Sequence, residues 1–372
     1  MTDKESLNTN QISTTTAVAE LPPEMAQLLD GLALQQGAAD QLSHARATVP
    51  ARKIAATVPA EGADGVFSQS WFPICLASDI PVGTVAGFDF LDGRVVAWRD
   101  SQGLVHVTSA YCPHMGASLE AGEVLGDRIR CAFHHWQFDS DGQCVETAIG
   151  DPAPSHACLF VFPTLERWDI IWVFNGEEPL YQLPNFPFPA ESLLFKTLSL
   201  PDLMPVDPWV QCANTPDIQH IKTLHRVSFA DDPYESVCWT PYSMEYSFEG
   251  FFDSGTAATW DVGVFGTSLY YQSAWLDGRW FGFMVPMGLP RPGSTRNFLV
   301  LAVQPTDNAA EDERFLDLCM LTELGILGED IGVLTTMRFQ PGNLTRSDKV
   351  LGRYFDYLRA YPRAHPSAQW IR

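Results

Sequence analysis

Two cysteine–histidine pairs within one short stretch constrain this chain more than any other feature of its sequence. The stretch YCPHMGASLEAGEVLGDRIRCAFHHWQF, residues 111–138, holds two Cys and three His, whereas the whole chain has eight Cys and nine His. Cys112 and His114 form a C-x-H pair, and Cys131 and His134 form a C-x-x-H pair after a loop of sixteen residues. Two pairs of sulfur and nitrogen donors separated by a loop indicate a metal site.

Spacing alone leaves the kind of metal open. Zinc accepts tetrahedral sets of two thiolates and two imidazoles, so these pairs fit a zinc-stabilised interaction module. The same donors, split over two loops, also fit a Rieske [2Fe–2S] cluster, in which thiolates bind one iron and imidazoles bind the other. A colourless protein would favour zinc, and a brown protein would favour the cluster.

The composition describes a folded, acidic protein. Of its 372 residues 46% are hydrophobic, which is enough for two domains or one large one. The net charge of −22 repels nucleic acid and anionic lipid. No run of about eighteen apolar residues occurs, and the N-terminus MTDKESLNTNQISTTT lacks the layout of a secretion signal. We expect a cytoplasmic protein with no nucleic-acid or membrane partner.

Aromatic content and turns divide the chain into four segments. Residues 1–66 contain no Phe, Trp or Tyr, and we expect a poorly ordered extension or a short helix in LPPEMAQLLDGLALQQ. Short β-rich runs broken by LDGR, DSQG and DSDG turns predict a small all-β antiparallel domain over 67–179. The proline-containing stretch 180–192 reads as a connector, and a second domain covers 193–372.

The second domain combines strands with helices. NTPDIQHIKTLH predicts a helix with Thr215 as its N-cap and Pro216 at its first position. Long β-rich segments follow from 239 to about 305, and helices are expected in DERFLDLCMLTELGILGEDIGVLTTM and SDKVLGRYFDYLRAY. This order predicts an antiparallel sheet packed with helices, so the whole chain is of the α+β class.

A second group of metal-binding residue types begins nearly eighty residues after the first. Asn214, Asp217, His220 and His225 form an N-x-x-D-x-x-H-x4-H pattern. Non-haem iron sites use two His and one carboxylate and leave positions open for dioxygen and substrate. Steps of three place the first three residues on one helical stripe, whereas His225 needs a bend or a helix end to join them. Taken alone, this pattern leaves metal binding and ordinary packed histidines equally open.

The first motif, CPHMGASLEAGEVLGDRIRCAFHHWQFDSDGQC, resembles the Rieske motif of aromatic-ring-hydroxylating oxygenases. In that family C-P-H-x-G-A and C-x-F-H-x-W-x-[FWY]-D recur. The resemblance implies that Cys112 and Cys131 bind one iron of a [2Fe–2S] cluster and that His114 and His134 bind the other. His135 would then be a neighbour of the cluster and not a ligand.

The second motif is similar to the one in the same family's catalytic domain. The resemblance implies that His220 and His225 bind a mononuclear Fe(II), and that Asp330, in LGEDIGVLTTMRFQP, completes the triad from a late helix. Asp217 matches the family aspartate that bridges the two metal centres during electron transfer. Asn214 would support the ligands without binding the iron.

The similarity extends from about residue 67 over almost all of the remaining chain. It looks closest to the branch that includes aminopyrrolnitrin oxygenase and the ketosteroid hydroxylase oxygenases. Members of the family take electrons from a separate ferredoxin or NAD(P)H-dependent reductase and assemble as homotrimers. The chain itself has neither a G-x-G-x-x-G nor a Walker-type loop, which also favours an external supply of electrons.

The sequence therefore predicts the terminal component of a Rieske non-haem iron oxygenase. It would use O2 to hydroxylate or N-oxidise a largely apolar, aromatic or polycyclic small molecule. In support, residues 239–283 hold fourteen aromatic side chains and few cationic ones. Two alternatives stay open: desaturation or oxidative cyclisation by the same iron, and a non-catalytic electron-transfer protein.

Overall fold

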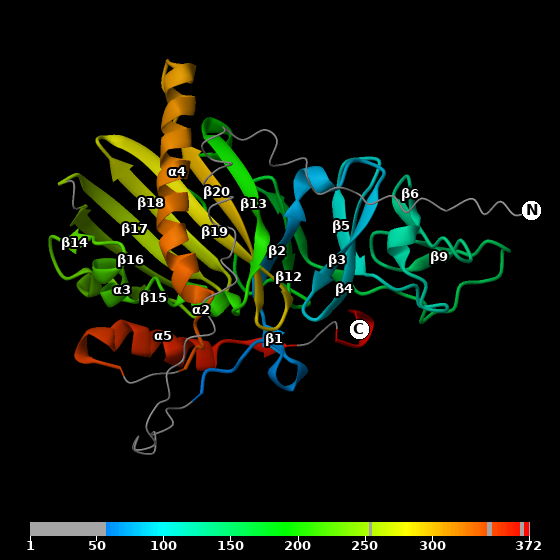
Figure 1. Ribbon diagram of the computed structural model, residues 1–372. Helices are drawn as coiled ribbons and strands as arrows, with labels where there is room; N and C mark the ends of the chain where they lie inside the picture. Colours follow the sequence, from blue (N-terminus) through cyan, green and yellow to red (C-terminus); the bar gives the residue numbers. More distant parts are fainter. Residues whose placement is uncertain (1–56, 253–254, 341–343, 365–367, 372) are drawn as a thin grey trace, which may run out of the picture.

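A computed structural model describes residues 57–252, 255–340, 344–364 and 368–371 of the chain. The helix expected in LPPEMAQLLDGLALQQ lies outside the described residues. Two β-rich parts follow one another along the chain, and Figure 1 shows them side by side.

The first part is all β, as predicted. Its longer strands lie in three antiparallel sheets, with the orders β10-β5-β4-β3, β11-β12-β2 and β6-β7-β8-β9. The strands are β2 (Trp71–Leu76), β3 (Val85–Phe90), β4 (Gly93–Arg99), β5 (Val105–Ser109), β6 (Glu123–Leu125), β7 (Arg128–Arg130), β8 (Gln137–Phe138), β9 (Cys144–Glu146), β10 (Val161–Phe162), β11 (Thr164–Arg167) and β12 (Ile170–Phe174).

The sheet β6-β7-β8-β9 lies at the end of the molecule farthest from the large sheet of the second part (Figure 1). The loop before β6 carries the first cysteine–histidine pair, and the loop between β7 and β8 carries the second. Trp98, Leu119, Ile129 and Phe138 form a fully buried core beneath these loops. The core therefore holds the two loops next to each other.

The second part is built on an eight-stranded antiparallel sheet of order β13-β20-β19-β18-β17-β16-β14, with β15 also paired to β16. This confirms the α+β class. Its elements are β13 (Leu194–Met204), α2 (Pro208–Cys212), α3 (Ile218–Thr223), β14 (Ser228–Phe229), β15 (Cys238–Trp239), β16 (Ser243–Phe251), β17 (Ala257–Phe265), β18 (Leu269–Leu276), β19 (Arg279–Arg291), β20 (Ser294–Val303), α4 (Ala309–Leu334), α5 (Lys349–Ala360), β21 (Arg363–Ala364) and α6 (Ala368–Ile371).

Helix α4 crosses one face of the large sheet (Figure 1). It begins after Asn308, whose side chain accepts a hydrogen bond from the backbone N–H of Glu311 and so caps the first turn. Leu316, Met320 and Leu324 recur at four-residue spacing, are fully buried, and pack on the sheet. None of the described helices is both long enough and apolar enough to cross a membrane.

Helix α3 begins later than the sequence predicts. Its N-cap is Asp217, whose side chain accepts a hydrogen bond from the backbone N–H of His220. Thr215 is not the cap, because its backbone N–H donates to the carbonyl of Cys212 and so continues the turn that follows α2. The prediction of Thr215 and Pro216 as the helix start is therefore wrong, and Asn214 does not share a helix with His220.

The two parts share a buried core. Trp71 and Trp172 of the first part pack in one cluster with Met284 and Phe298 of the large sheet. Gly288 in β19 permits a close approach, since a Cβ at this position would collide with the backbone carbonyl of Pro73. The two parts are therefore fitted to each other at their boundary.

Segments that the sequence places outside the two domains also pack against them. Leu183 and Phe186, in the predicted connector, are buried in the shared core. Within residues 57–66, Glu61 is 3% exposed and its backbone N–H donates to the side chain of Asp207 in the second part. The strand that follows, β1 (Phe67–Ser68), pairs with β21 near the other end of the chain.

Candidate metal centres

The two cysteine–histidine loops have matching geometry. The backbone N–H of Gly116 donates to the carbonyl of Cys112, and that of His135 donates to the carbonyl of Cys131, at 2.8 and 3.0 Å. Gly116 and His135 both have left-handed φ angles, 76° and 56°. Each cysteine is therefore followed by a tight turn that reverses the chain, and His114 and His134 lie within these two turns.

The sulfur donors lie inside and the nitrogen donors lie nearer the surface. Cys112 and Cys131 are 3% and 1% exposed. Burial, together with the neighbouring Cys131 and Cys144 thiols, raises the pKa of the Cys112 thiol to about 12. A metal that binds here must displace the thiol protons.

The two imidazoles lie edge to face beside this site. The ring centroids of His114 and His134 are 4.5 Å apart, and Trp136 stacks on His114 at 4.3 Å with an angle of 5° between the ring planes. Two buried thiols beneath two outer imidazoles fit a [2Fe–2S] cluster with one sulfur-bound and one nitrogen-bound iron.

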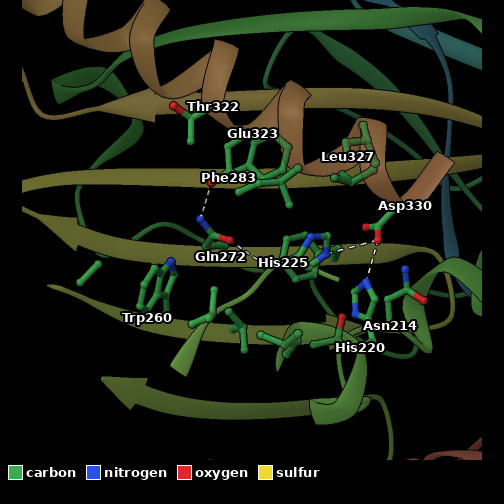
Figure 2. A pocket seen from close by; sticks show the side chains of 18 of the residues that line it. Asn214, His220, His225, Trp260, Gln272, Phe283, Thr322, Glu323, Leu327 and Asp330 are labelled. Carbon is green, nitrogen blue, oxygen red and sulfur yellow. Dashed lines mark hydrogen bonds and ion pairs between the residues drawn. The ribbon is translucent and has the colours of Figure 1, made fainter. Parts of the chain in front are cut away.

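The second site brings together three residues that the sequence singles out. His220 Nε2 lies 2.7 Å from Asp330 Oδ1, and His225 Nε2 lies 3.2 Å from the same oxygen. Figure 2 shows both rings turned toward the Asp330 carboxylate of α4. One donor atom from each residue lies within 4.8 Å of the others. Two imidazoles and one carboxylate at this spacing form the donor set of a non-haem iron site.

The end of α3 brings His225 into this site, as the sequence predicts. Leu224 is the C-cap of α3, and Arg226 has a left-handed φ of 55° that turns the chain after the helix. The His220 and His225 rings are therefore nearly perpendicular, at 81°, with centroids 4.4 Å apart. The two histidines can therefore reach the same site without lying on one face of a helix.

The carboxylates beside the histidines shift the local pKa values. Burial raises the pKa of Asp330, but hydrogen bonds from His220 and His225 outweigh it and hold this pKa below its usual range. Burial lowers the pKa of His225, but Asp330 and Glu329 outweigh it and raise this pKa above its usual value. The site is therefore electronegative and suited to a cation.

Glu329 contacts His225, and the sequence did not predict this contact. Its Oε2 lies 3.0 Å from His225 Nδ1, on the opposite side of the ring from Asp330. A carboxylate at this position orients a ligating imidazole and fixes which nitrogen faces the metal. The available signal was its position directly before Asp330, since two adjacent acids on a helix can reach the two nitrogens of one histidine.

The remaining predicted residues fall near the site or outside it. Asp217 caps α3 and accepts from the backbone N–H of His220 at 3.1 Å. Asn214 lies beside His220 and Asp330 (Figure 2) and lines the adjoining cavity. Another carboxylate of α4, that of Asp317, pairs with Lys196 at 2.5 Å and lies outside the group of His220, His225 and Asp330.

A cavity of about 260 Å³ opens from this triad between α3, α4 and the large sheet. None of the described residues that line it is Lys or Arg. Its walls are mostly aromatic and aliphatic, and include Phe248, Trp260, Phe281, Phe283, Val285, Met287 and Leu327. Such walls favour an apolar ligand whose reactive atom lies against the metal-binding end.

Comparison with known proteins agrees with this division. A Rieske [2Fe-2S] domain model matches residues 70–163. Cholesterol 7-desaturase nvd of Bombyx mori is 33% identical over 125 residues, which are 32% of this chain and 28% of that protein. The oxygenase component of 3-ketosteroid-9-alpha-monooxygenase of Rhodococcus rhodochrous is 33% identical over 121 residues, 32% of this chain and 31% of that protein. The chain thus matches about a third of these relatives' length.

The likeness to solved structures covers more of the chain. Dicamba monooxygenase bound to dicamba superimposes with a TM-score of 0.60 at 18% identity, over 78% of this chain and 97% of that one. NdmB of Pseudomonas putida CBB5 superimposes with a TM-score of 0.61 at 18% identity, over 78% and 90%. At this identity the likeness shows a shared fold.

The matched segment contains all four residues of the first site, so the chain carries a Rieske domain, and a [2Fe–2S] cluster is its cofactor. In its two-part architecture it has the fold of a Rieske oxygenase subunit, as the resemblance of its motifs implied.

Proposed function

We propose that this chain is the terminal oxygenase component of a Rieske non-haem iron system. The observation that carries the proposal is the convergence of His220, His225 and Asp330 at one end of an apolar cavity. Two nitrogens and one oxygen hold a metal ion on one side and leave its other side open to the cavity. A site of this kind, in a chain that also carries a Rieske domain, is suited to oxidation of a bound small molecule.

The two donor sets have separate roles in this proposal. Cys112, His114, Cys131 and His134 would hold the cluster, and the triad would hold Fe(II). When bound, these groups supply electrons and activate O2. The protein itself binds and orients the substrate, excludes water from the apolar cavity, and holds His225 in place through Glu329.

The electrons and the assembly involve other chains. We infer a separate ferredoxin or NAD(P)H-dependent reductase, because the sequence has no dinucleotide-binding loop. We also propose a homotrimer, which sedimentation analysis would test. Co-expression of His134→Ala with His220→Ala gives a functional test: activity returns in mixed assemblies only if sites on different subunits work together.

The substrate in this proposal is largely apolar and aromatic or polycyclic. The aromatic and aliphatic cavity walls support this, as does the lack of Lys and Arg among the described lining residues. Solved structures of similar fold were obtained with dicamba and with caffeine, which are ring compounds. Hydroxylation and N-oxidation are the reactions that we expect.

Desaturation is a second candidate, favoured by the similarity to cholesterol 7-desaturase. Oxidative cyclisation belongs with it, because both remove hydrogen without adding oxygen to the product. A non-catalytic electron-transfer protein is the third candidate, and it predicts that the triad holds no iron.

One experiment separates the three. Anaerobically purified protein is assayed for iron, and turnover with a surrogate reductase under ¹⁸O2 is followed by mass analysis of arylamine, indole and steroid products. An ¹⁸O label in the product supports the oxygenase, and an unlabelled product two hydrogens lighter supports the desaturase. Absence of mononuclear iron, or stoichiometric zinc, would contradict both.

A further inference from the structure

A chain of hydrogen bonds lies along the largely apolar cavity, away from the triad. Tyr270 Oη donates to Gln272 Oε1 at 2.6 Å, and Gln272 Nε2 donates to Glu323 Oε1 at 2.7 Å. Gln272 and Glu323 are 5% and 6% exposed, and both line the cavity. Figure 2 shows Gln272, from the sheet, turned toward Glu323 of α4.

No Lys or Arg pairs with the Glu323 carboxyl among the described residues. Its one hydrogen bond comes from the neutral Gln272 amide, and the described residues offer no donor to its second oxygen. Burial raises its pKa to about 7, and the Gln272 hydrogen bond and the charge of His225 offset part of this effect. A buried carboxylate without an adjacent counter-charge is costly to ionise, so a ligand that brings a positive charge beside it would be favoured.

Glu323 stands at a defined distance from the metal-binding end. It precedes Asp330 by seven residues on the same helix, which is close to two full turns, so both side chains lie on the face toward the sheet. At 1.5 Å per residue the two positions are about 10 Å apart along the helix axis. The cavity therefore has a metal-binding end and an acidic end, with apolar walls between them.

We propose that Glu323 and Gln272 form an anchor for a protonated amine on the substrate's apolar ring system. This inference rests on the proposed function and specifies its substrate class. The ammonium group would donate to the free oxygen of Glu323 and provide an adjacent counter-charge. A hydroxyl group would donate as well but would leave the carboxylate uncompensated, and an anionic substrate would be repelled.

The anchor also determines which atom is oxidised. The backbone positions of Glu323 and Asp330 are about 10 Å apart along the helix, so an amine held at Glu323 lies away from the metal-binding end. Of the two reactions proposed above, a substrate anchored in this way favours hydroxylation of a ring or chain carbon remote from the amine over N-oxidation of the anchored amine.

Matched probes test the anchor directly in the metal-loaded protein. Tetralin, 2-aminotetralin, 2-tetralol, 2-tetralone and tetralin-2-carboxylate share one skeleton and differ in the polar group. Dissociation constants are measured anaerobically by calorimetry, without reductase. We expect 2-aminotetralin to bind at least tenfold more tightly than tetralin and the carboxylate to bind most weakly. Equal affinities for amine and hydrocarbon, or tighter binding of 2-tetralone, would overturn the proposal.

Glu323→Gln keeps the shape and removes the charge. We expect it to weaken 2-aminotetralin binding by tenfold or more and to leave tetralin binding unchanged. The control is Glu313→Gln, an exposed position on the same helix that pairs with Lys196 outside the cavity, and it should preserve the preference for the amine. If Glu323 only ties α4 to the sheet, Glu323→Gln weakens all five probes alike, and the proposal fails.

The outcomes distinguish this proposal from the function on which it depends. If the iron content and ¹⁸O incorporation are as expected but the amine has no advantage, the anchor is wrong and the oxygenase stands. If the amine preference depends on Glu323 but no mononuclear iron is found, the cavity binds amines without being an oxygenase site. Should Glu323→Gln not fold, the probe series in the unmodified protein still decides.

Discussion

His220 Nε2 and Asp330 Oδ1 lie 2.7 Å apart although 110 residues separate them in the sequence. The contact joins the short helix α3 to the long helix α4 at the metal-binding end of the cavity. His225 Nε2 approaches the same oxygen at 3.2 Å. One carboxylate oxygen faces two imidazole nitrogens, so His220, His225 and Asp330 are the residues that would hold a metal ion here.

Asp330→Ala should lose the mononuclear iron and keep the cluster. The substitution removes one of three ligands, whereas the first site shares no residue with the second. Iron analysis should fall from about three to about two per chain, as the two ligand sets imply, with the visible spectrum of the cluster unchanged. Asp317→Ala, on the same helix but paired with Lys196, is the control and should keep all the iron. Three irons in Asp330→Ala would show that another carboxylate is the ligand.

His134→Ala should lose the visible spectrum of the cluster, and His135→Ala should keep it. The two histidines are neighbours, but only the His134 ring lies beside His114, at 4.5 Å between centroids. His135 is exposed and occupies the turn after the cysteine loop. Absorption and electron paramagnetic resonance spectra of the two variants check this. A bleached His135→Ala protein with an intact His134→Ala spectrum would reverse the assignment.

Glu329→Ala should weaken iron binding without abolishing it. Glu329 contacts Nδ1 of His225, whereas Nε2 of the same ring faces Asp330 and the proposed iron position. Loss of such a partner lowers metal affinity by about 10- to 100-fold. Competition with a chelator, followed by iron analysis, measures the effect. Glu329→Gln keeps an oxygen acceptor and should fall between Glu329→Ala and the unmodified protein; an Ala variant that holds iron normally would remove this role.

The sequence was sufficient to predict a Rieske domain, because the residues of its motif are close together in the chain. Cys112 to His134 span one pair of loops, and local spacing determines which side chains meet. The fold class was equally accessible, because the all-β part and the late helices α4 and α5 each carry their own periodicity. These features depend on neighbours in the chain more than on tertiary contacts.

The second site depends on how distant segments pack together, which the spacing of residues in the sequence does not show. Asp330 was inferred by resemblance, since nothing local distinguishes it from Asp317 or Glu323 on the same helix. The predicted start of α3 was wrong. Thr215 and Pro216 are residue types that often begin a helix, but the backbone N–H of Thr215 is bonded to the turn that follows α2. The contact of Glu329 with His225 and that of Gln272 with Glu323 form only when α4 packs against α3 and the sheet.

Asp217 has one observed role and one predicted role, and a single substitution can separate them. It caps α3 by accepting from the backbone N–H of His220, and the resemblance of the motif predicts that its carboxylate links the two metal centres. Asn caps a helix as well as Asp does, whereas Ala costs about 1 kcal/mol, which corresponds to about 1–2 °C in Tm for a chain of this length. We therefore expect Asp217→Asn to keep the Tm and both metals, and Asp217→Ala to lower the Tm.

Turnover then decides whether the charge of Asp217 matters. If the carboxylate links the centres, Asp217→Asn should turn over slowly despite its normal stability and metal content. Asp232→Asn is the control, because Asp232 is also an N-cap carboxylate, accepting from the backbone N–H of Tyr234 at 3.0 Å, and belongs to neither metal site. Its rate should be normal. A normal rate in Asp217→Asn as well would leave Asp217 with the capping role alone.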